Sequence, residues 1–294
     1  MKCLSLLAFI LFAAFEMVAV AQVSSETSAH SRVKALKELA RRAESVEFTL
    51  LNTRIDGDGI DRQLLRFQSD QLTQFALLLR PAGKAPSKGW PVVIFNHGTH
   101  PNPPQYGKNA KGDDSRPGDY YRALVQRYAL SGFAVLAPDQ RGHNQSQGVR
   151  FTQDLQSNYW YARDTIQATL ALQSIEGLDL DRVYMAGHSR GGRISQLASL
   201  ALGKRLNAVS IWSTGVAQIV MGDQLSGLQA PMQIQHGSRD RVTPLKSSLM
   251  LAENLHRLEQ SFELHVYDTE KHLFQGDHFE LAIEKDVRWF NAHP

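Results

Sequence analysis

The sequence predicts an α/β fold with a mostly parallel central sheet that is covered by helices on both faces. Two observations predict this class. From residue 92 onward, short apolar segments typical of buried strands alternate with longer segments whose apolar residues recur at helical spacing. Polar segments separate these elements. Because strands joined through helices run parallel, this alternation favours a parallel sheet.

The first strands are expected to be antiparallel and to open the sheet. Val46–Leu51 and Leu64–Arg80 alternate apolar and polar side chains, as half-buried strands do. The turn signal Asp56-Gly57-Asp58-Gly59 lies between them, and Pro81–Gly89 follows as a polar turn.

The later elements are expected in strict alternation. Strands are predicted at Val92–Phe95, Phe133–Ala137, Val183–Ala186, Ala208–Trp212, Met232–Gln235 and Glu263–Tyr267. Helices are predicted at Tyr120–Leu130, Tyr159–Gln173, Ser247–Leu258 and Phe279–Phe290. The polar stretch Thr99–Gly118 is expected to overhang a site at the carboxyl ends of the strands, where ligands of such sheets bind.

The first 21 residues are interpreted as a cleaved secretory signal peptide. Lys2 precedes an apolar stretch, Leu4–Phe15, and the small-residue pattern Ala19-Val20-Ala21 follows. The apolar stretch is short for a bilayer span, which favours cleavage over the alternative, a permanent membrane anchor. We therefore expect a periplasmic or secreted protein. The single cysteine, Cys3, would leave with the signal, so neither a disulfide nor a cysteine nucleophile is expected.

Charge and composition exclude several kinds of partner. The formal net charge of +3 is unchanged by cleavage, because Lys2 and Glu16 leave together. No basic cluster is interleaved with aromatic residues, so nucleic acid is not expected as a partner. No glycine-rich phosphate loop follows the first parallel strand, so no nucleotide cofactor is expected.

A metal site is also not expected. His97 and His100 lie near Asp113 and Asp114 in the sequence, but their spacing fits no strong ligand pattern. Solvated loop residues are the simpler interpretation. The prediction is a protein without metal or cofactor.

The segment from Val183 to Gly192 carries the chemistry. It is an apolar strand pattern that ends in Gly187-His188-Ser189-Arg190-Gly191 and continues as a helical pattern. A serine raised on a tight strand-to-helix turn needs a strained backbone and flanking residues without a Cβ, which Gly187 and Gly191 supply. The segment therefore resembles a nucleophile elbow. The alternative is an ordinary small-residue turn with an exposed serine.

A serine nucleophile requires a base and an acid that orients the base. Asp240 follows one predicted strand and His272 follows the next. The order Ser189, Asp240, His272 is the order of nucleophile, acid and base when all three follow strands of one sheet. The backbone N–H of Arg190, at the start of the predicted helix, would face an oxyanion.

Each role has competitors. Asp223 and Asp268 are rival acids, but one lies in a predicted surface excursion and the other within or just after a strand. His265 alternates within a strand and His278 is expected to start the last helix, so both are weaker bases than His272. Three further histidines are expected to shape the site or hold backbone groups: His97, His188 and His236.

Several segments together resemble the α/β-hydrolase group that contains the prolyl oligopeptidase catalytic domain and dienelactone hydrolase. They are Asn96-His97-Gly98-Thr99, Asp139–His143 with Ser146 and Gly148, Asp181-Arg182-Val183, the Gly187–Gly192 elbow and the His236–Pro244 loop. The resemblance covers roughly Pro81 to the C-terminus. It implies Ser189 as nucleophile, Asp240 as acid, His272 as base, and the backbone N–H groups of Thr99 and Arg190 as the oxyanion hole. Dienelactone hydrolases carry cysteine as nucleophile, so their particular chemistry is not implied.

The domain prediction is a signal peptide (1–21), an N-terminal helical extension (22–45) and an α/β-hydrolase catalytic domain (46–294). The extension has an amphipathic pattern over Ser28–Ala43 and either packs on the domain or forms a mobile leader. Too few residues precede the predicted sheet for the propeller domain that prolyl oligopeptidases usually carry.

Three functions are therefore considered. The first is a secreted serine hydrolase that cleaves carboxylic esters; the second is a peptidase of the prolyl oligopeptidase type; the third is a non-catalytic binding protein with a hydrolase fold. The expected partner is a small-molecule ester or a short peptide, and the oligomeric state is left open. Apolar residues within Gly215–Ala230 either line an acyl pocket or pack a small helix.

Overall fold

The computed structural model describes residues 30–42, 46–55, 58–99, 117–149, 155–217 and 222–294. The predicted signal peptide and most of the predicted Thr99–Gly118 overhang lie outside these residues. Within them, no helix is both long enough and apolar enough to span a membrane.

A single nine-stranded sheet forms the centre of the described chain, with the strand order β1-β2-β3-β5-β4-β6-β7-β8-β9. The strands are β1 (Thr49–Ile55), β2 (Ile60–Ser69), β3 (Leu72–Pro81), β4 (Trp90–Asn96), β5 (Ala134–Pro138), β6 (Leu178–His188), β7 (Ala208–Trp212), β8 (Met232–Gly237) and β9 (Phe262–Tyr267). The pairs β1–β2, β2–β3 and β3–β5 are antiparallel, and all pairs from β5 to β9 are parallel. The predicted fold class and the antiparallel opening are confirmed.

One detail of the opening differs from the expectation. Leu64–Arg80 is not one strand but parts of two, β2 and β3, joined by a tight turn at Asp70 and Gln71. Both turn residues have positive φ, 49° and 65°. Such a hairpin turn usually contains Asn-Gly or Asp-Gly, so Asp-Gln gave little signal in the sequence.

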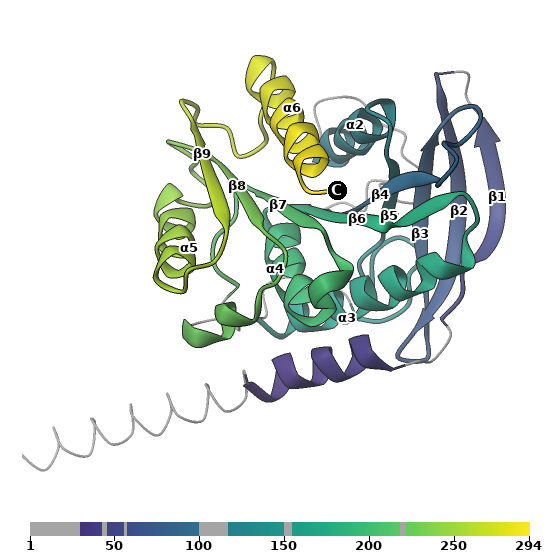
Figure 1. Cartoon of the computed structure of the whole chain (residues 1–294), viewed down its shortest axis with the longest axis horizontal. Coiled ribbons are helices and arrows are strands. Elements are labelled where there is room, and N and C mark those ends of the chain that lie inside the picture. Colours follow the sequence, from purple (N-terminus) through teal and green to yellow (C-terminus); the bar gives the residue numbers. More distant parts are fainter. Residues whose placement is uncertain (1–29, 43–45, 56–57, 100–116, 150–154, 218–221) are drawn as a thin grey trace, which may run out of the picture.

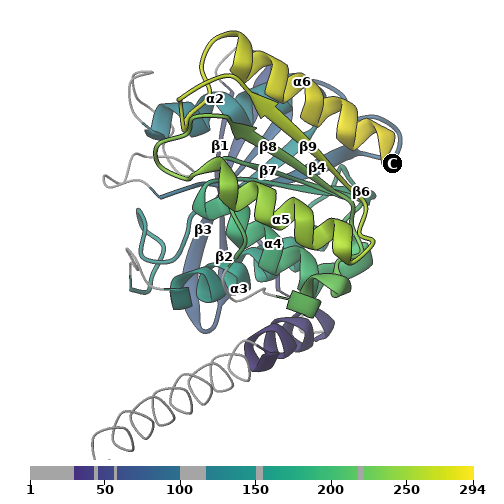
Figure 2. The same ribbon diagram turned by 90° about the vertical axis from the view of Figure 1, so that its left-hand side faces the viewer.

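Helices cover both faces of the sheet, as Figures 1 and 2 show. They are a helix at residues 30–41, α2 (Pro117–Leu130), α3 (Leu155–Ala171), α4 (Arg190–Leu202), α5 (Leu245–Arg257) and α6 (Asp277–Ala292). Short 3₁₀ helices occur at η1 (Leu172–Ser174), η2 (Gly203–Arg205) and η3 (Gly222–Gly227). Side chains of α2 and α6 share one core, and side chains of the 30–41 helix, α3, α4 and α5 share the other.

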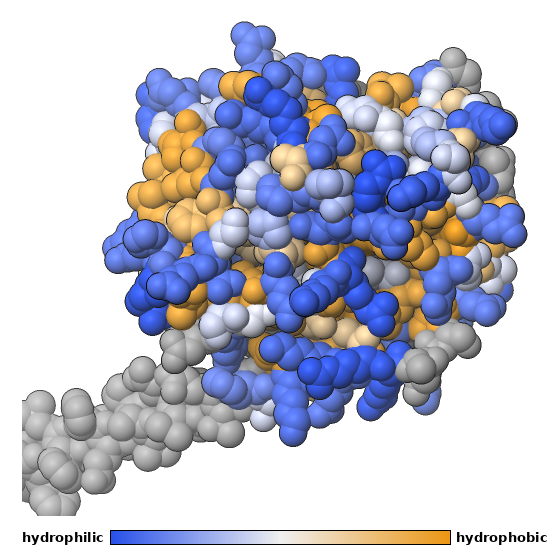
Figure 3. Space-filling model, viewed as in Figure 1, coloured by the Kyte–Doolittle hydropathy of each residue, from blue (hydrophilic) through white to orange (hydrophobic). Residues whose placement is uncertain are grey.

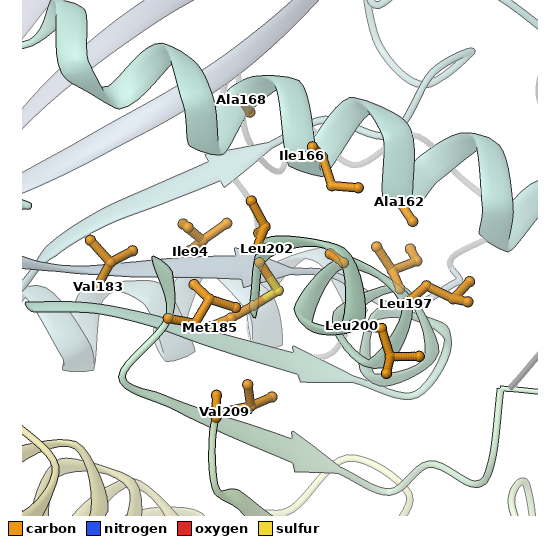
Figure 4. Packing of buried hydrophobic residues seen from close by; sticks show 14 of the residues in the cluster. Ile94, Ala162, Ile166, Ala168, Val183, Met185, Leu197, Leu200, Leu202 and Val209 are labelled. Atoms are coloured by element: carbon orange, nitrogen blue, oxygen red, sulfur yellow. The ribbon is translucent and has the colours of Figure 1, made fainter. Parts of the chain in front are cut away.

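The larger core lies between the sheet and the helices α3 and α4. Figure 4 shows Ile166 of α3 and Leu197 of α4 directed toward the same space as Ile94 and Met185 of the strands. All four side chains are fully buried. Burial of apolar area at about 25 cal/mol per Å² is what holds such a layer together, so α4 is fixed firmly against β6.

The helix at residues 30–41 presents one apolar side to this core. Val33, Leu36, Leu39 and Ala40 are buried, as expected for the face of an amphipathic helix that packs on a domain. Leu36, Leu39 and Ala40 belong to the same cluster as residues of α3 and α4.

The outer surface is mostly hydrophilic on the face shown in Figure 3. An apolar area at the left of that view lies over α5 and β9. These two elements expose Leu249, Met250 and Val266.

Candidate active site

Ser189 lies between β6 and α4 in a strained backbone conformation. Its φ is 56° and its ψ is −120°. A serine with positive φ is uncommon and is maintained only when its surroundings fix it. Its N–H donates to the carbonyl of Trp212 at 2.8 Å, and its carbonyl accepts from the N–H of Gly192 at 3.0 Å. The strand β7 and the first turn of α4 therefore hold the turn from both sides.

Three glycines make this turn possible. A Cβ on Gly187 would lie 2.4 Å from the carbonyl oxygen of Gly191, and a Cβ on Gly191 would lie 1.9 Å from the carbonyl oxygen of Asn96. A Cβ on Gly192 would lie 2.5 Å from Cγ2 of Thr214. The close approach of β4, β6 and α4 thus requires glycine at 187 and 191, whereas Gly192 leaves room for the side chain of Thr214. The sequence analysis singled out only the first two.

Asp240 and His272 meet beside this turn. Nδ1 of His272 lies 2.7 Å from Oδ2 of Asp240. The other carboxylate oxygen, Oδ1, accepts from the backbone N–H groups of Val242 at 2.8 Å and Thr243 at 3.0 Å. The Asp240 side chain is fully buried and that of His272 is 15% exposed. A histidine that donates through Nδ1 presents Nε2 as the basic nitrogen.

The electrostatics keep Asp240 ionised. Burial raises the pKa of this carboxyl, but the hydrogen bond from His272 and those from the backbone outweigh burial and leave the pKa below its usual value. An ionised carboxylate next to an imidazole stabilises the protonated form of the ring.

His188, within the Gly-X-Ser-X-Gly sequence, contacts the backbone of His272 and holds that loop in place. Its Nδ1 lies 2.9 Å from the hydroxyl of Tyr121 and its Nε2 lies 2.9 Å from the carbonyl oxygen of His272. Burial, and secondarily the nearby His272, lower the pKa of His188 to about 3. The ring is therefore neutral, so Nε2–H donates to the carbonyl of His272 and Nδ1 accepts from Tyr121.

His236 supports the acid loop in a similar way. Its Nδ1 lies 2.7 Å from Oγ of Ser248, and its Nε2 lies 2.8 Å from the carbonyl oxygen of Thr243. Burial lowers the pKa of this histidine. The loop that carries Asp240 is thus tied to α5.

The segment after β4 lies against the serine. A Cβ on Gly98 would lie 3.0 Å from Cβ of Ser189 and 2.2 Å from the Tyr121 hydroxyl oxygen. The amide of Gln140 donates to the carbonyl of His97 at 2.6 Å and holds this segment in place. Gly98 belongs to the Asn96–Thr99 segment of the family resemblance, but its contact with Ser189 was not predicted, although a glycine directly after a strand end is a signal for such an approach.

Asn96 joins three elements under the same segment. Its amide nitrogen donates to Oγ of Ser195 on α4 at 3.0 Å, and its amide oxygen accepts from Oγ1 of Thr165 on α3 at 2.8 Å. Thr99 follows Gly98 and is exposed, and Arg190 is the first residue of α4. Both proposed oxyanion-hole residues therefore directly follow segments fixed next to Ser189.

The rival residues lie elsewhere. His265 on β9 bonds with Glu263 and Gln233, and His278 in the first turn of α6 lies against the ring of Tyr267. Asp268 is exposed and pairs with Arg239 at 3.1 Å. Asp223 lies in η3.

Some residues named in the sequence analysis lie outside the part of the chain that the structure describes. His100, Asp113 and Asp114 lie outside them, as do residues 218–221 of the Gly215–Ala230 excursion. Of the residues of that excursion in the described part, Leu225 is fully buried in the larger core and Val216 packs against it. Leu225 thus packs the domain and does not line a pocket.

The chain is similar to known hydrolases and peptidases in sequence and in structure. Residues 117–222 match a family model described as serine aminopeptidase, S33. The chain is 23% identical over 197 residues to the uncharacterized peptidase YtmA of Bacillus subtilis, which covers 56% of this chain and 74% of that protein. It is 24% identical over 260 residues to dipeptidyl peptidase 8 of Homo sapiens, covering 75% of this chain and only 28% of that protein.

Solved structures share the fold. An acetyl xylan esterase from a Paenibacillus species superposes with a TM-score of 0.63 at 17% identity, covering 92% of this chain and 94% of that chain. The acylaminoacyl peptidase of Pyrococcus horikoshii gives a TM-score of 0.61 at 16% identity, covering 82% and 44%. With the nine-stranded sheet, these likenesses show the α/β-hydrolase fold, which the chain shares with solved esterases and peptidases.

Proposed function

We propose that the protein is a carboxylic ester hydrolase that works through an acyl-enzyme on Ser189. The observation that carries the proposal is the 2.7 Å contact between His272 and the buried Asp240, next to a serine with φ of 56°. Acyl transfer requires a nucleophile on a fixed turn, a base, and an acid that orients the base.

In this mechanism Nε2 of His272 takes the proton of Ser189 as the serine oxygen attacks the substrate carbonyl carbon. The carbonyl oxygen becomes an oxyanion, which the backbone N–H groups of Thr99 and Arg190 bind. The C–O bond to the alcohol then breaks, and His272 gives its proton to the leaving oxygen. Water, deprotonated by His272, attacks the acyl-enzyme and releases the carboxylic acid and free Ser189.

Two kinds of substrate are consistent with the fold. Esterase activity is favoured by the acetyl xylan esterase likeness, which spans nearly the whole of both chains, whereas the match to dipeptidyl peptidase 8 covers 28% of that protein. A peptidase is the second candidate, because the serine aminopeptidase model and the YtmA match point to short peptides.

The test measures kcat/KM on p-nitrophenyl butyrate and on a prolyl p-nitroanilide, with Ser189→Ala as the blank for both. We expect ester hydrolysis that disappears in the variant and no anilide cleavage. Comparable Ser189-dependent cleavage of the anilide would replace the esterase proposal with the peptidase one. Silence on both substrates would favour a narrower substrate or the binding-protein alternative.

We also propose that the protein is exported and cleaved after Ala21. This proposal rests on the sequence of residues 1–21 alone. N-terminal sequencing of the protein recovered outside the cytoplasm should begin at Gln22. A recovered chain that begins at Met1 would contradict cleavage.

A further inference from the structure

Two arginines lie one turn apart at the start of α4, directly after Ser189. Arg190 and Arg193 are spaced i, i+3, so they share a face of the helix. Side chains of a helix extend over the turn that precedes them, so Arg193 extends toward Arg190 and the Ser189 end of α4. The guanidinium of Arg190 lies 6.0 Å from the ring centre of Tyr161 on α3.

Arg193 carries its charge in a half-buried position without a counter-ion. Within the described part of the chain it makes no ion pair, and its buried Nε has no hydrogen-bond partner. Burial and the charge of Arg190 both lower the pKa of Arg193, and no carboxylate raises it. Arg141, by contrast, is buried between Asp164 at 2.6 Å and Asp70 at 2.9 Å. A half-buried cation normally has a partner, because desolvating it alone is unfavourable.

A second unpartnered polar group lies on the facing helix. Asn158 is 5% exposed, and its buried Oδ1 has no hydrogen-bond partner. It precedes Tyr161 by one turn of α3 and shares its face, so it lies toward the same end of the helix pair as Arg190 and Arg193. The unpartnered atom is an acceptor, so it suits a hydroxyl or N–H donor of a substrate and does not itself bind an anion.

We propose that Arg193, together with Arg190, binds a carboxylate carried by the substrate. The substrate class is then an ester that bears a negative charge near the reacting carbonyl. This inference rests on the proposed serine hydrolase function, because it places the anion next to the nucleophile Ser189. Guanidinium groups suit this role, since their planar N–H donors match the two oxygens of a carboxylate.

The experiment compares matched charged and neutral esters. One pair, p-nitrophenyl hydrogen adipate and p-nitrophenyl hexanoate, places the charge on the acyl side. The other pair, 4-acetoxybenzoate and 4-acetoxybenzamide, places it on the alcohol side. For each pair, the ratio of kcat/KM is measured in the wild type, in Arg193→Gln and Arg193→Lys, and in Arg205→Gln. Arg205 is an exposed arginine just beyond the far end of α4, so it controls for loss of one charge.

We expect Arg193→Gln to lower the charged-to-neutral ratio of at least one pair about tenfold or more, because a charge-assisted hydrogen bond is lost. Arg193→Lys should restore part of it, and Arg205→Gln should leave both ratios unchanged. Ratios that change no more in Arg193→Gln than in Arg205→Gln would overturn the inference while the esterase proposal stands. Hydrolysis that persists in Ser189→Ala would instead overturn the proposed function.

Discussion

Two buried aspartates in this protein have opposite electrostatics. Asp240, at the carboxyl edge of the sheet, has a lowered pKa, whereas burial raises the pKa of Asp286 on α6 to about 6. Both accept several hydrogen bonds. Oδ1 of Asp286 accepts from Ser210, Gln233 and Gln235, and Oδ2 accepts from Trp212 at 2.8 Å and from Tyr128.

The partners explain the difference. Every donor to Asp286 is a neutral side chain, and the residue is completely buried, so desolvation dominates. Asp240 faces His272, which can carry a positive charge, and two backbone N–H groups. Hydrogen bonds from neutral side chains therefore do not offset the effect of burial on the pKa of Asp286, whereas those from His272 and the backbone do so for Asp240. The surroundings of Asp240 therefore suit a proposed role beside a proton-transferring histidine. Asp286 joins α6 to α2 and to the sheet through its hydrogen bonds.

The largest effect is expected for Asp240→Asn. An asparagine of the same shape removes the charge that stabilises protonated His272 and favours the wrong tautomer, so kcat should fall by about 10⁴-fold. Steady-state hydrolysis of p-nitrophenyl butyrate measures this. A variant that kept more than about a tenth of wild-type kcat would contradict a catalytic role for Asp240.

Asp286→Asn should affect folding instead of catalysis. The NH₂ group of asparagine must face either Trp212 or the Gln and Ser donors, so at least one buried donor loses its acceptor. We expect the free energy of unfolding to fall by about 3 kcal/mol. Urea denaturation at pH 4, below the pH range in which Asp286 titrates, checks this, with Glu284→Gln on the exposed side of the same helix as control. A variant as stable as the wild type would show that Asp286 does not join the layers.

The pH dependence separates the two aspartates further. Asp286 has a raised pKa when folded, so between about pH 4 and 6 the native state holds a proton that the unfolded state has released. Its contribution to stability is therefore present at low pH and declines as the pH rises through this window, by up to about 3 kcal/mol. Asp240 acts in the opposite direction, because its folded pKa lies below the ordinary value of 3.8, so its contribution to stability is present above that value and declines as the pH falls.

Two histidines change the unfolding free energy in the same pH range, but in the opposite direction. His188 and His236 have lowered pKa values when folded, so they favour unfolding as the pH falls. The informative quantity is therefore the difference in unfolding free energy between wild type and Asp286→Asn, in which these histidines cancel. That difference should shrink from pH 4 to pH 6, and a constant difference would argue against a raised pKa for Asp286.

Tyr128→Phe should give the smallest effect. It removes one of the two donors to Oδ2 of Asp286 and leaves Trp212 in place, so we expect a loss of about 1 kcal/mol in unfolding free energy. Because this hydrogen bond lowers the pKa of Asp286, its removal should also extend the pH window upward. A variant with an unchanged pH dependence would show that Tyr128 does not act on this carboxyl.

The sequence predicted the edge of the sheet that carries Ser189 better than the hydrogen bonds around Asp286. The elbow and the strand Ala208–Trp212 were placed correctly because glycine spacing and apolar runs are local signals. Asp286 was missed, although it falls three to four residues from the buried Ala282, Ile283 and Trp289 on one helix face. Its donors come from three other elements, α2, β7 and β8, and no local pattern reveals such contacts.

Two other features gave little or no signal in the sequence: the turn between β2 and β3, and the close contacts of Gly98. The Asp70-Gln71 turn lacks the glycine or asparagine that marks such turns, so β2 and β3 were read as one stretch. The close contact of Gly98 with Tyr121 and Ser189 was not predicted, because these residues are distant from it in sequence.

The central claim is that His272 activates Ser189. The most direct measurement is the rate and position of labelling by diisopropyl fluorophosphate, followed by peptide mass spectrometry, in the wild type and in His272→Ala. In the wild type we expect a single adduct, on the peptide that contains Ser189. In His272→Ala the labelling rate should fall by orders of magnitude. An adduct on another residue, or equal labelling rates in both proteins, would contradict it.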